Sequence, residues 1–593
     1  MKNKAKYKTE WDLSYIYNDN VEAQVKKDNA VVESSYKIFA SKYQKNKSYL
    51  KNSDVLKRAL EEYEKLLYSV HSSRPYMYFA YRKNLDSQDN EAVAELAKLT
   101  DFHAKLANQI KFFPLEIGKI PKRTQKKFLK DNELLPFKYL LQKIFENAKY
   151  RLSENEEKIM TLKKTPAQGM WISGFSRLLN KQMVSFKGKN MPVSKATGLM
   201  SSLNTKERRI LHDNIMVIYE SIADFAESEI NAIVTDKKIN DKLRGYNRPY
   251  EATVLEYEND LKTIENLLAA INNNMHIAHR FYKLKAKMLG QKKLFYADRN
   301  AKLGQVKTKI PLESAIKQTI KSFNSADSFF GNFVKEMFEK GLVDAYPKKG
   351  KVGGAFCSSA FRLPTYVLLN HVSDFKSLTT LAHEMGHALH TEFSKKQRPF
   401  YEDYTIATAE VASTFFENLV FENALEKVSR EEKIILLHDK ISDDISTVFR
   451  QIACFNFENE LHQSIRKEGF LPKEKIAELM NKHMQKYLGP VFDLKPRDGY
   501  FFVHWSHIRR FFYVYSYAFG NLISTTLYQR YKKDKSKIKD VIKFLSAGSS
   551  DSPENIFRSI GINPDKKFFE KGLEKIKEDI KKLEQLWRST AHS

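Results

Sequence analysis

The chain has 593 residues with a formal net charge of +28, and 42% of its residues are hydrophobic. This composition excludes wholesale disorder, and the length predicts about two to four lobes instead of one simple core. The only cysteines, Cys357 and Cys454, lie far apart in sequence, which excludes a disulfide-rich scaffold and favours a reducing compartment.

The lysines that give the chain its charge are spread through every segment, in short clusters such as residues 122–127 and 532–539. Nucleic-acid-binding proteins instead concentrate basic residues on one face or stripe. We therefore predict a solvated basic surface and no nucleic-acid partner. The charge could still steer acidic peptides toward the protein.

The N-terminal eleven residues are charged, and no apolar segment follows them, so we expect no secretory signal. No clean apolar run reaches the roughly 18 residues that a membrane helix needs. The nearest candidate, residues 511–527, contains Ser, Asn, Gly and several Tyr, which predicts a buried helix with polar groups. We expect a cytoplasmic protein without a membrane partner.

Helical periodicity dominates the chain, because apolar residues recur at spacings of three and four. This spacing predicts helices over residues 54–67, 90–102, 208–235, 260–290 and 568–587. No solenoid repeat or low-complexity linker marks a domain boundary. The sequence therefore predicts a mainly α fold.

Stretches with strand character are few. Residues 183–186, followed by Gly188, form a weak hairpin candidate, and residues 355–370 form a stronger one. Residues 366–370 are rich in β-forming side chains and follow Pro364. Such a strand could hold an extended substrate at a sheet edge, or it could be a buried strand without that role.

The most informative motif is the H-E-x-x-H pentad His383-Glu384-Met385-Gly386-His387, inside an apolar run that predicts a helix over residues 378–389. Residues four apart lie on one face of a helix, so both imidazoles can bind one metal ion. Glu384 lies about 100° round the helix, where it could act on a metal-bound water. This pattern is typical of a zinc peptidase; the alternative is a helix with two structural histidines.

A third ligand has to come from elsewhere in the chain. A structural zinc site usually uses clustered Cys, which this chain lacks. A metzincin would place Gly at position 390 and His at position 393, where this chain has His390 and Phe393. Glu410 lies in a small, apolar segment downstream, and a buried carboxylate needs a partner or a metal.

Glu417 follows Glu410 by seven residues and falls on nearly the same helix face. It could accept a hydrogen bond from a ligating imidazole, or it could be a surface charge.

Several motifs together resemble the oligoendopeptidase F branch of the thimet-oligopeptidase-like M3 metallopeptidases. They are the pentad, the Thr-Ala-Glu-Val-Ala-Ser run at residues 408–413, and the segments 350–356 and 505–520. Gly386 suits this pattern, because a glycine inside a helix costs roughly 1 kcal/mol relative to alanine and needs a reason such as a close approach. The resemblance covers essentially the whole chain.

The resemblance implies the architecture. We expect a multi-lobed helical zincin with a small β-sheet beside the H-E-x-x-H helix and a deep channel that admits short peptides. It implies an N-terminal helical lobe over residues 1–110, an oligopeptidase F-type helical domain over 111–195 and an M3 catalytic domain over 196–593.

The resemblance also implies the roles of individual residues. His383, His387 and Glu410 would bind one zinc ion, and Glu384 would be the general base. His507 and the tyrosines of residues 512–517 would contact the substrate and the oxyanion of the transition state.

Neutral N–H and O–H groups suit the oxyanion role. Tyr513 and Tyr517, four residues apart, would share a helix face, whereas Tyr515 would point elsewhere. Each of these aromatic residues could instead belong to the core, and His390 and His504 are expected to be structural.

The predicted activity is zinc-dependent hydrolysis of internal bonds in oligopeptides, with Glu384 activating the water. An aminopeptidase-type zincin is the second enzyme hypothesis, but no Gly-Ala-Met-Glu-Asn element is present. The non-enzyme alternative is a basic helical binding protein with a vestigial zinc site. The sequence leaves the oligomeric state open.

Overall fold

The computed structural model describes residues 7–589, except for the side chain of Glu154. Residues 1–6, on which part of the expectation about a secretory signal rests, lie outside the described residues. The chain divides into two compact units. Unit 1 comprises Met1–Lys149, Thr308–Ala424 and Tyr528–Ile556, and unit 2 comprises Tyr150–Lys307, Leu425–Leu527 and Phe557–Ser593.

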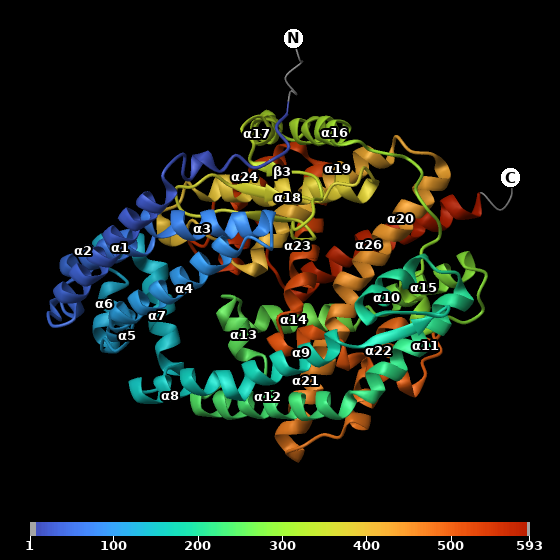
Figure 1. The fold of residues 1–593 in the computed structure, drawn as a ribbon, viewed down its shortest axis with the longest axis horizontal. Coiled ribbons are helices and arrows are strands. Elements are labelled where there is room, and N and C mark those ends of the chain that lie inside the picture. The colour runs from blue at the N-terminus through green and yellow to red at the C-terminus, as the bar shows by residue number, and fades with distance from the viewer. Residues whose placement is uncertain (1–6, 590–593) are drawn as a thin grey trace, which may run out of the picture. The chain divides into compact units, whose positions relative to one another are not determined.

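The N-terminal part of unit 1 is a packed group of helices (Figure 1). Two of them begin at side-chain caps, because Asn52 and Asp89 each accept a hydrogen bond from a backbone N–H of the first turn. Apolar faces of these helices form one core that includes Phe39, Leu60 and Phe113. The helices are α1 (Val21–Tyr43), α2 (Ser53–Leu67), α3 (Val70–Leu85), α4 (Asn90–Ile110), α5 (Phe112–Gly118), α6 (Lys122–Phe128) and α7 (Lys138–Asn147).

The rest of unit 1 contains the H-E-x-x-H segment. Its elements are α16 (Leu312–Asn324), α17 (Ser328–Glu339), β3 (Val343–Asp344), β4 (Phe356–Ser358), β5 (Tyr366–Leu368), α18 (Phe375–Ser394), α19 (Ile406–Leu425), α24 (Ile538–Leu545) and α25 (Pro553–Ser559). Helix α18 packs against α16, α17 and α24 and against strands β4 and β5. A small sheet beside the H-E-x-x-H helix is therefore confirmed.

The strands of this sheet are ordered β3-β5-β4. Strand β5 lies in the centre, parallel to β3 and antiparallel to β4, with Cys357 opposite Val367. Of the two alternatives for residues 366–370, the structure supports the buried strand, because β5 is paired on both sides and fully buried. The two edge strands are β3, which is buried, and β4, whose residues are half-buried.

Unit 2 is also mainly helical. Its elements are α8 (Glu154–Lys164), α9 (Met170–Asn180), β1 (Met183–Phe186), β2 (Lys189–Pro192), α10 (Val193–Leu199), α11 (Thr205–Ser221), α12 (Ala223–Arg244), α13 (Glu251–Glu256), α14 (Leu261–Asn272), α15 (His276–Met288), α20 (Arg430–Ile445), α21 (Gln451–Glu468), α22 (Lys473–Leu488), α23 (Tyr515–Lys533) and α26 (Lys566–Arg588). Helix α23 runs across the boundary between the two units in the chain. The mainly helical, multi-lobed fold with small sheets is confirmed.

The predicted helices differ from the observed ones mainly in continuity. The segment 208–235 is two helices separated at Ile222, and the segment 260–290 breaks between Asn272 and His276. Apolar periodicity continues across these breaks because both helices of each pair bury a face. The apolar spacing therefore indicates which residues are buried, but it does not indicate where one helix ends and the next begins in another direction.

The weak hairpin candidate is confirmed as β1 and β2, with Met183 opposite Pro192. The two-residue connection consists of Lys187 and Gly188, and both have positive φ. A type I′ turn requires positive φ at both central positions, and its twist matches that of the paired strands. Gly188 meets this requirement without steric cost.

The buried helix predicted over residues 511–527 begins four residues later, at Tyr515. Phe511 and Phe512 have φ values of 40° and 62°, a backbone conformation that a helix cannot contain. Among the described residues, no helix is both long enough and apolar enough to cross a membrane.

Candidate functional site

Helix α18 carries the first part of the candidate site. It begins at Asp374, whose side chain accepts a hydrogen bond from the backbone N–H of Ser377. His383 and His387 lie one turn apart on this helix, with ring centroids 5.0 Å apart. Both imidazoles are partly exposed, whereas Glu384 between them is buried.

Gly386 lets α19 approach this helix closely. A Cβ atom at Gly386 would lie 2.7 Å from Cα of Ser413 and 3.2 Å from the carbonyl oxygen of Ala412. Contacts with backbone atoms at this distance cannot be relieved by a side-chain rotation. The glycine therefore allows α19 to place Glu410 beside the two histidines.

His383, His387 and Glu410 form a cluster that we call the metal triad. Oε2 of Glu410 lies 3.4 Å from Nε2 of His383 and 3.9 Å from Nε2 of His387. One ligand atom from each residue lies within 4.8 Å of the other two. Ligands about 2.1 Å from a tetrahedral zinc ion are roughly 3.4 Å apart, so the donor atoms and their spacing fit zinc.

Two more side chains on α19 hold the triad in place. Oε2 of Glu417 lies 3.0 Å from Nδ1 of His383, on the ring nitrogen that faces away from Glu410. The Ser413 hydroxyl donates to Oε2 of Glu410 at 3.1 Å. A carboxylate on Nδ1 fixes the tautomer that leaves Nε2 free to bind a metal.

The protonation of the triad follows from these contacts. Burial lowers the pKa of His383, but the hydrogen bonds that its ring N–H groups donate to Glu410 and Glu417 outweigh burial and raise the pKa to about 10. Burial and the neighbouring His383 charge lower the pKa of His387 to about 4. A metal ion would displace the proton from His383, because only the neutral imidazole is a ligand.

Glu384 lies beside the edge strand β4. Burial raises the pKa of its carboxyl group to about 7, against the opposing charge of His383 and a hydrogen bond to the backbone of Cys357. A carboxyl group with a pKa near neutrality can both accept and return a proton. Cys357 is half-buried and forms no disulfide.

His507, Tyr513 and Tyr517 form a second cluster, which we call the donor cluster, in unit 2. Nδ1 of His507 is hydrogen-bonded to the Tyr513 hydroxyl, and the Tyr517 hydroxyl lies 3.5 Å from that of Tyr513. Burial, with help from the charges of Arg450 and Arg510, lowers the pKa of His507 to about 4. The cluster therefore presents neutral N–H and O–H groups at neutral pH.

The turn that carries Tyr513 is fixed by buried hydrogen bonds. The backbone N–H of Phe512 donates to Glu458 at 2.9 Å, and the Thr253 hydroxyl donates to the carbonyl oxygen of Phe511 at 2.9 Å. Tyr513 lies before the first residue of α23, so the expected helical face shared with Tyr517 is replaced by this turn. These contacts stabilise two consecutive residues in a strained conformation.

Other residues considered in the sequence are structural in their surroundings. Tyr515 is fully buried and donates to Asn259. His390 is buried, and its ring stacks on that of Tyr404 with the ring centroids 3.7 Å apart. The ring of His504 stacks on that of Tyr219 with the centroids 5.5 Å apart.

The structure thus groups the predicted site residues into two sets, the metal triad with Glu384 in unit 1 and the donor cluster in unit 2. Sequence reasoning missed Ser413 and the backbone of Cys357. Ser413 lies three residues after Glu410, a helical spacing that could have identified it. The contact of Cys357 depends on strand pairing, for which the sequence carries no signal.

Two protein-family models match this chain. Residues 199–575 match the model of peptidase family M3, and residues 116–184 match the model named oligopeptidase F.

Curated relatives are similar over nearly the whole chain. The oligoendopeptidase F homolog of Borreliella burgdorferi is 28% identical over 579 residues, covering 95% of this chain and 96% of the relative. Oligopeptidase PepF of Bacillus subtilis is 26% identical and covers 90% of this chain and 82% of its own length.

Solved structures share the fold. A crystal structure described as a putative peptidase from Chlamydophila abortus superposes with a TM-score of 0.84 at 22% identity, covering 98% of this chain and 99% of that one. The crystal structure of oligoendopeptidase-F from Enterococcus faecium superposes with a TM-score of 0.70 at 18% identity, covering 96% of this chain and 100% of that one.

Proposed function

This chain belongs to peptidase family M3, and we propose that it is a zinc-dependent endopeptidase that cleaves internal bonds of short oligopeptides. The observation that carries the proposal is the metal triad, whose donor atoms and spacing suit zinc. Glu384, buried next to the triad, supplies the general base. A vestigial site would not need to retain the ligands, the base and the Glu417 contact together.

Zinc, when bound to His383, His387 and Glu410, supplies a Lewis acid that polarises the scissile carbonyl and makes a water more acidic. The side chain of Glu384 accepts the proton of the attacking water and returns it to the leaving amine. Its carboxyl group is buried beside the triad, within reach of both proton transfers.

Strand β4 is the proposed docking site for the substrate backbone. It is a half-buried edge, and its Cys357 backbone contacts the Glu384 carboxyl group. A peptide added to this edge as a further strand would run past the general base.

The donor cluster is proposed to bind substrate and to stabilise the oxyanion. Burial keeps His507 neutral at neutral pH, so its imidazole can donate a hydrogen bond as an uncharged group. Tyr513 and Tyr517 add hydroxyl groups to the same cluster. Preorganised donors of this kind lower a barrier because they need no reorientation during the reaction.

We also propose features of the architecture and the location of the protein. They are the division into residues 1–110, 111–195 and 196–593, a deep channel that admits short peptides, and a cytoplasmic location without a nucleic-acid or membrane partner. Both cysteines are free, which suits a reducing compartment.

The proposed function is tested with Glu384→Gln. This variant should retain stoichiometric zinc but cleave an internally quenched peptide with blocked ends about 10²- to 10⁴-fold more slowly, since it loses the general base. Glu392→Gln, a change at a partly exposed position of the same helix that pairs with Lys395, is the matched control and should behave like the wild type. Wild-type activity in Glu384→Gln would refute the assigned base, and activity unaffected by a chelator would refute the metal.

The ligand set is tested with Glu410→Ala. Removal of one of three protein ligands should cause zinc to be lost on dialysis, as measured by metal analysis. If the zinc content is unchanged, Glu410 is not a ligand.

A further inference from the structure

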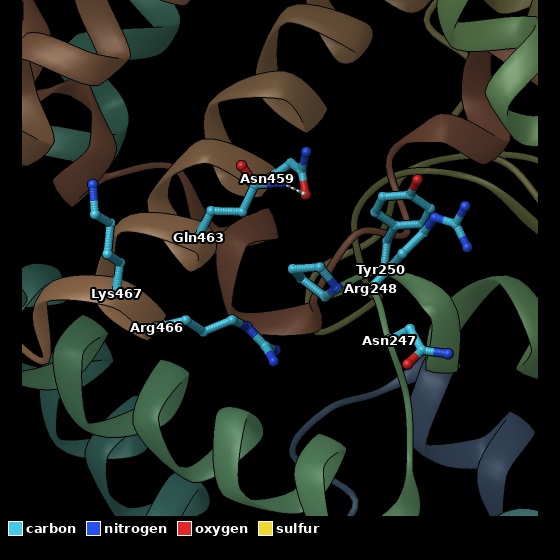
Figure 2. A pocket seen from close by; sticks show the side chains of 8 residues that line it. Asn247, Arg248, Tyr250, Asn459, Gln463, Arg466 and Lys467 are labelled. Carbon is cyan, nitrogen blue, oxygen red and sulfur yellow. Dashed lines mark hydrogen bonds between the residues drawn. The ribbon is translucent and has the colours of Figure 1, made fainter.

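Unit 2 contains a cavity of about 460 Å³ that the peptidase chemistry does not use. It lies between the segment before α13 and helix α21 (Figure 2). Among the described residues, no carboxylate lines it. The lining residues are Asn247, Arg248, Pro249, Tyr250, Asn459, Gln463, Arg466 and Lys467.

The cations of this cavity are incompletely balanced. Arg466 is ion-paired with Asp241, which also pairs with Lys237 at 2.9 Å, and the buried Glu458 is a second carboxylate that acts on Lys237. Nε of Arg466 is buried without a hydrogen-bond partner among the described residues. Figure 2 shows the Arg466 side chain extending from α21 toward the segment that carries Asn247 and Arg248.

The two flanking cations add to this imbalance. Lys467 forms no ion pair with any described residue, whereas Arg248 pairs with Glu265 at 2.9 Å. Glu251, the other nearby carboxylate, accepts the backbone N–H groups of Asn247 and Arg248 and does not line the cavity. Lys467 therefore adds a positive charge that no ion pair with a described residue balances, at a cavity where Nε of Arg466 lacks a hydrogen-bond partner.

The remaining polar lining supplies neutral hydrogen-bonding groups. Gln463 and Asn459 contribute amides that are weakly hydrogen-bonded to each other at 3.4 Å, and Asn247 adds a third. Burial raises the pKa of Tyr250, so its hydroxyl keeps its proton at neutral pH. Guanidinium and amide N–H groups together form a typical environment for an anionic oxygen.

We propose that this cavity is a binding site for a small oxyanion, a carboxylate or a phosphate, with Arg466 as the principal contact and Lys467 and Arg248 as supporting charges. Its volume is within the range of small-molecule sites. A bound anion would add a second negative partner for Arg466, which shares Asp241 with Lys237.

The site also touches the turn that supports the donor cluster. The Tyr250 ring packs against Phe512 with centroids 6.0 Å apart, and Asn459 directly follows Glu458, which accepts the Phe512 N–H. An anion held between residues 247–250 and α21 would therefore stiffen two contacts of the strained turn, the Tyr250 ring and Glu458. This consequence rests on the proposed function, whereas the binding site itself does not.

The test is calorimetric titration of the full chain with inorganic phosphate, with N-acetyl-leucine, which has a free carboxylate, and with neutral N-acetyl-leucinamide. We expect saturable binding of one equivalent of at least one anion, weakened by added salt, and none of the neutral amide. Absence of binding by both anions at millimolar concentration would overturn the proposal. Binding is measured without turnover, so its failure is distinct from failure of the proposed peptidase.

Variants locate the bound anion. Arg466→Gln should weaken binding at least about tenfold. Because this change also disturbs the pair with Asp241, the double variant Arg248→Gln/Lys467→Gln provides a second test on partly exposed side chains and should weaken binding in the same direction.

The matched control, Lys283→Gln/Lys292→Gln, removes two exposed charges that do not line the cavity and should bind as the wild type does. Equal weakening in the control and the cavity variants would overturn the site. If only N-acetyl-leucine binds, the oxyanion that occupies the site is the carboxylate of a peptide. If only phosphate binds, the oxyanion is free phosphate.

Discussion

Around His383, two carboxylates of α19 have different roles. Glu410 approaches Nε2, the metal-facing nitrogen, and Glu417 approaches Nδ1. The carboxylate on Nδ1 orients the ring and increases its basicity, so it affects the metal without touching it. This arrangement separates the ligand from its support.

From this arrangement we predict that Glu417→Gln weakens zinc affinity by about 10- to 100-fold without removing the site, since the amide can still accept from Nδ1 but carries no charge. Competition with a chelator measures the affinity. Glu426→Gln, an exposed change just beyond the same helix, should leave it unchanged. An affinity equal to that of the wild type in Glu417→Gln would show that the carboxylate is only a surface charge.

At the residue scale, the pentad spacing was sufficient to predict that His383 and His387 share a face. The position of Glu410 was predicted only as a candidate, because its distance from the histidines depends on how α19 packs. The backbone contact of Cys357 with Glu384 could not be predicted, since it arises from a strand register.

At the scale of elements, the close packing of α18 on α19 depends on one glycine. Alanine is a better helix former than glycine by about 1 kcal/mol, so local propensity alone would favour Gly386→Ala. The added methyl group would instead meet the backbone of Ser413 at 2.7 Å. The helices would have to separate, and Glu410 would move with α19.

We therefore predict that Gly386→Ala lowers both zinc affinity and thermal stability, as measured by chelator competition and by Tm. The control is Gly174→Ala in α9, where the nearest atom would lie at an ordinary contact distance of 3.8 Å. That change should be neutral or slightly stabilising. A Gly386→Ala variant with normal zinc binding would show that the two helices can adjust.

Sequence patterns predicted which segments form elements better than they predicted where elements end. Residues 208–235 were expected to be continuous and contain a break at Ile222. Strand residues 366–368 were identified, but their central place in the sheet was not, because edge or centre depends on which strands pair.

At the scale of the whole molecule, several histidines are buried in the neutral form. Burial and the charge of Lys285 lower the pKa of His438 to about 4, despite the adjacent Asp439. The unfolded chain binds this proton at its ordinary pKa, near 6.5. Stability from His438 is therefore fully present above about pH 6.5 and is lost as the pH falls toward 4, by about 1.4 kcal/mol per pH unit.

This sign predicts that the free energy of unfolding falls between pH 7 and pH 5, and that His438→Asn reduces this fall by roughly 2 kcal/mol. Denaturant unfolding at pH 7 and pH 5 measures the free energy of unfolding of each protein at both values. The difference between the two pH values is compared, so a change in stability that is the same at both pH values does not affect the result. His276→Asn, at an exposed position, should leave the fall unchanged. A fall of wild-type size in His438→Asn would show that His438 titrates normally in the fold.

The sequence by itself determined the helical class, the metal-binding pentad and the candidate residues, because helical periodicity and an i, i+4 pair are local properties of the chain. Only the tertiary structure decided that Gly386 admits α19, that β4 is the edge beside Glu384, and that His507 contacts Tyr513 through a strained turn. Each of these features depends on packing between segments far apart in sequence. Such contacts produce no periodic pattern of residues along the chain, so the sequence alone does not reveal them.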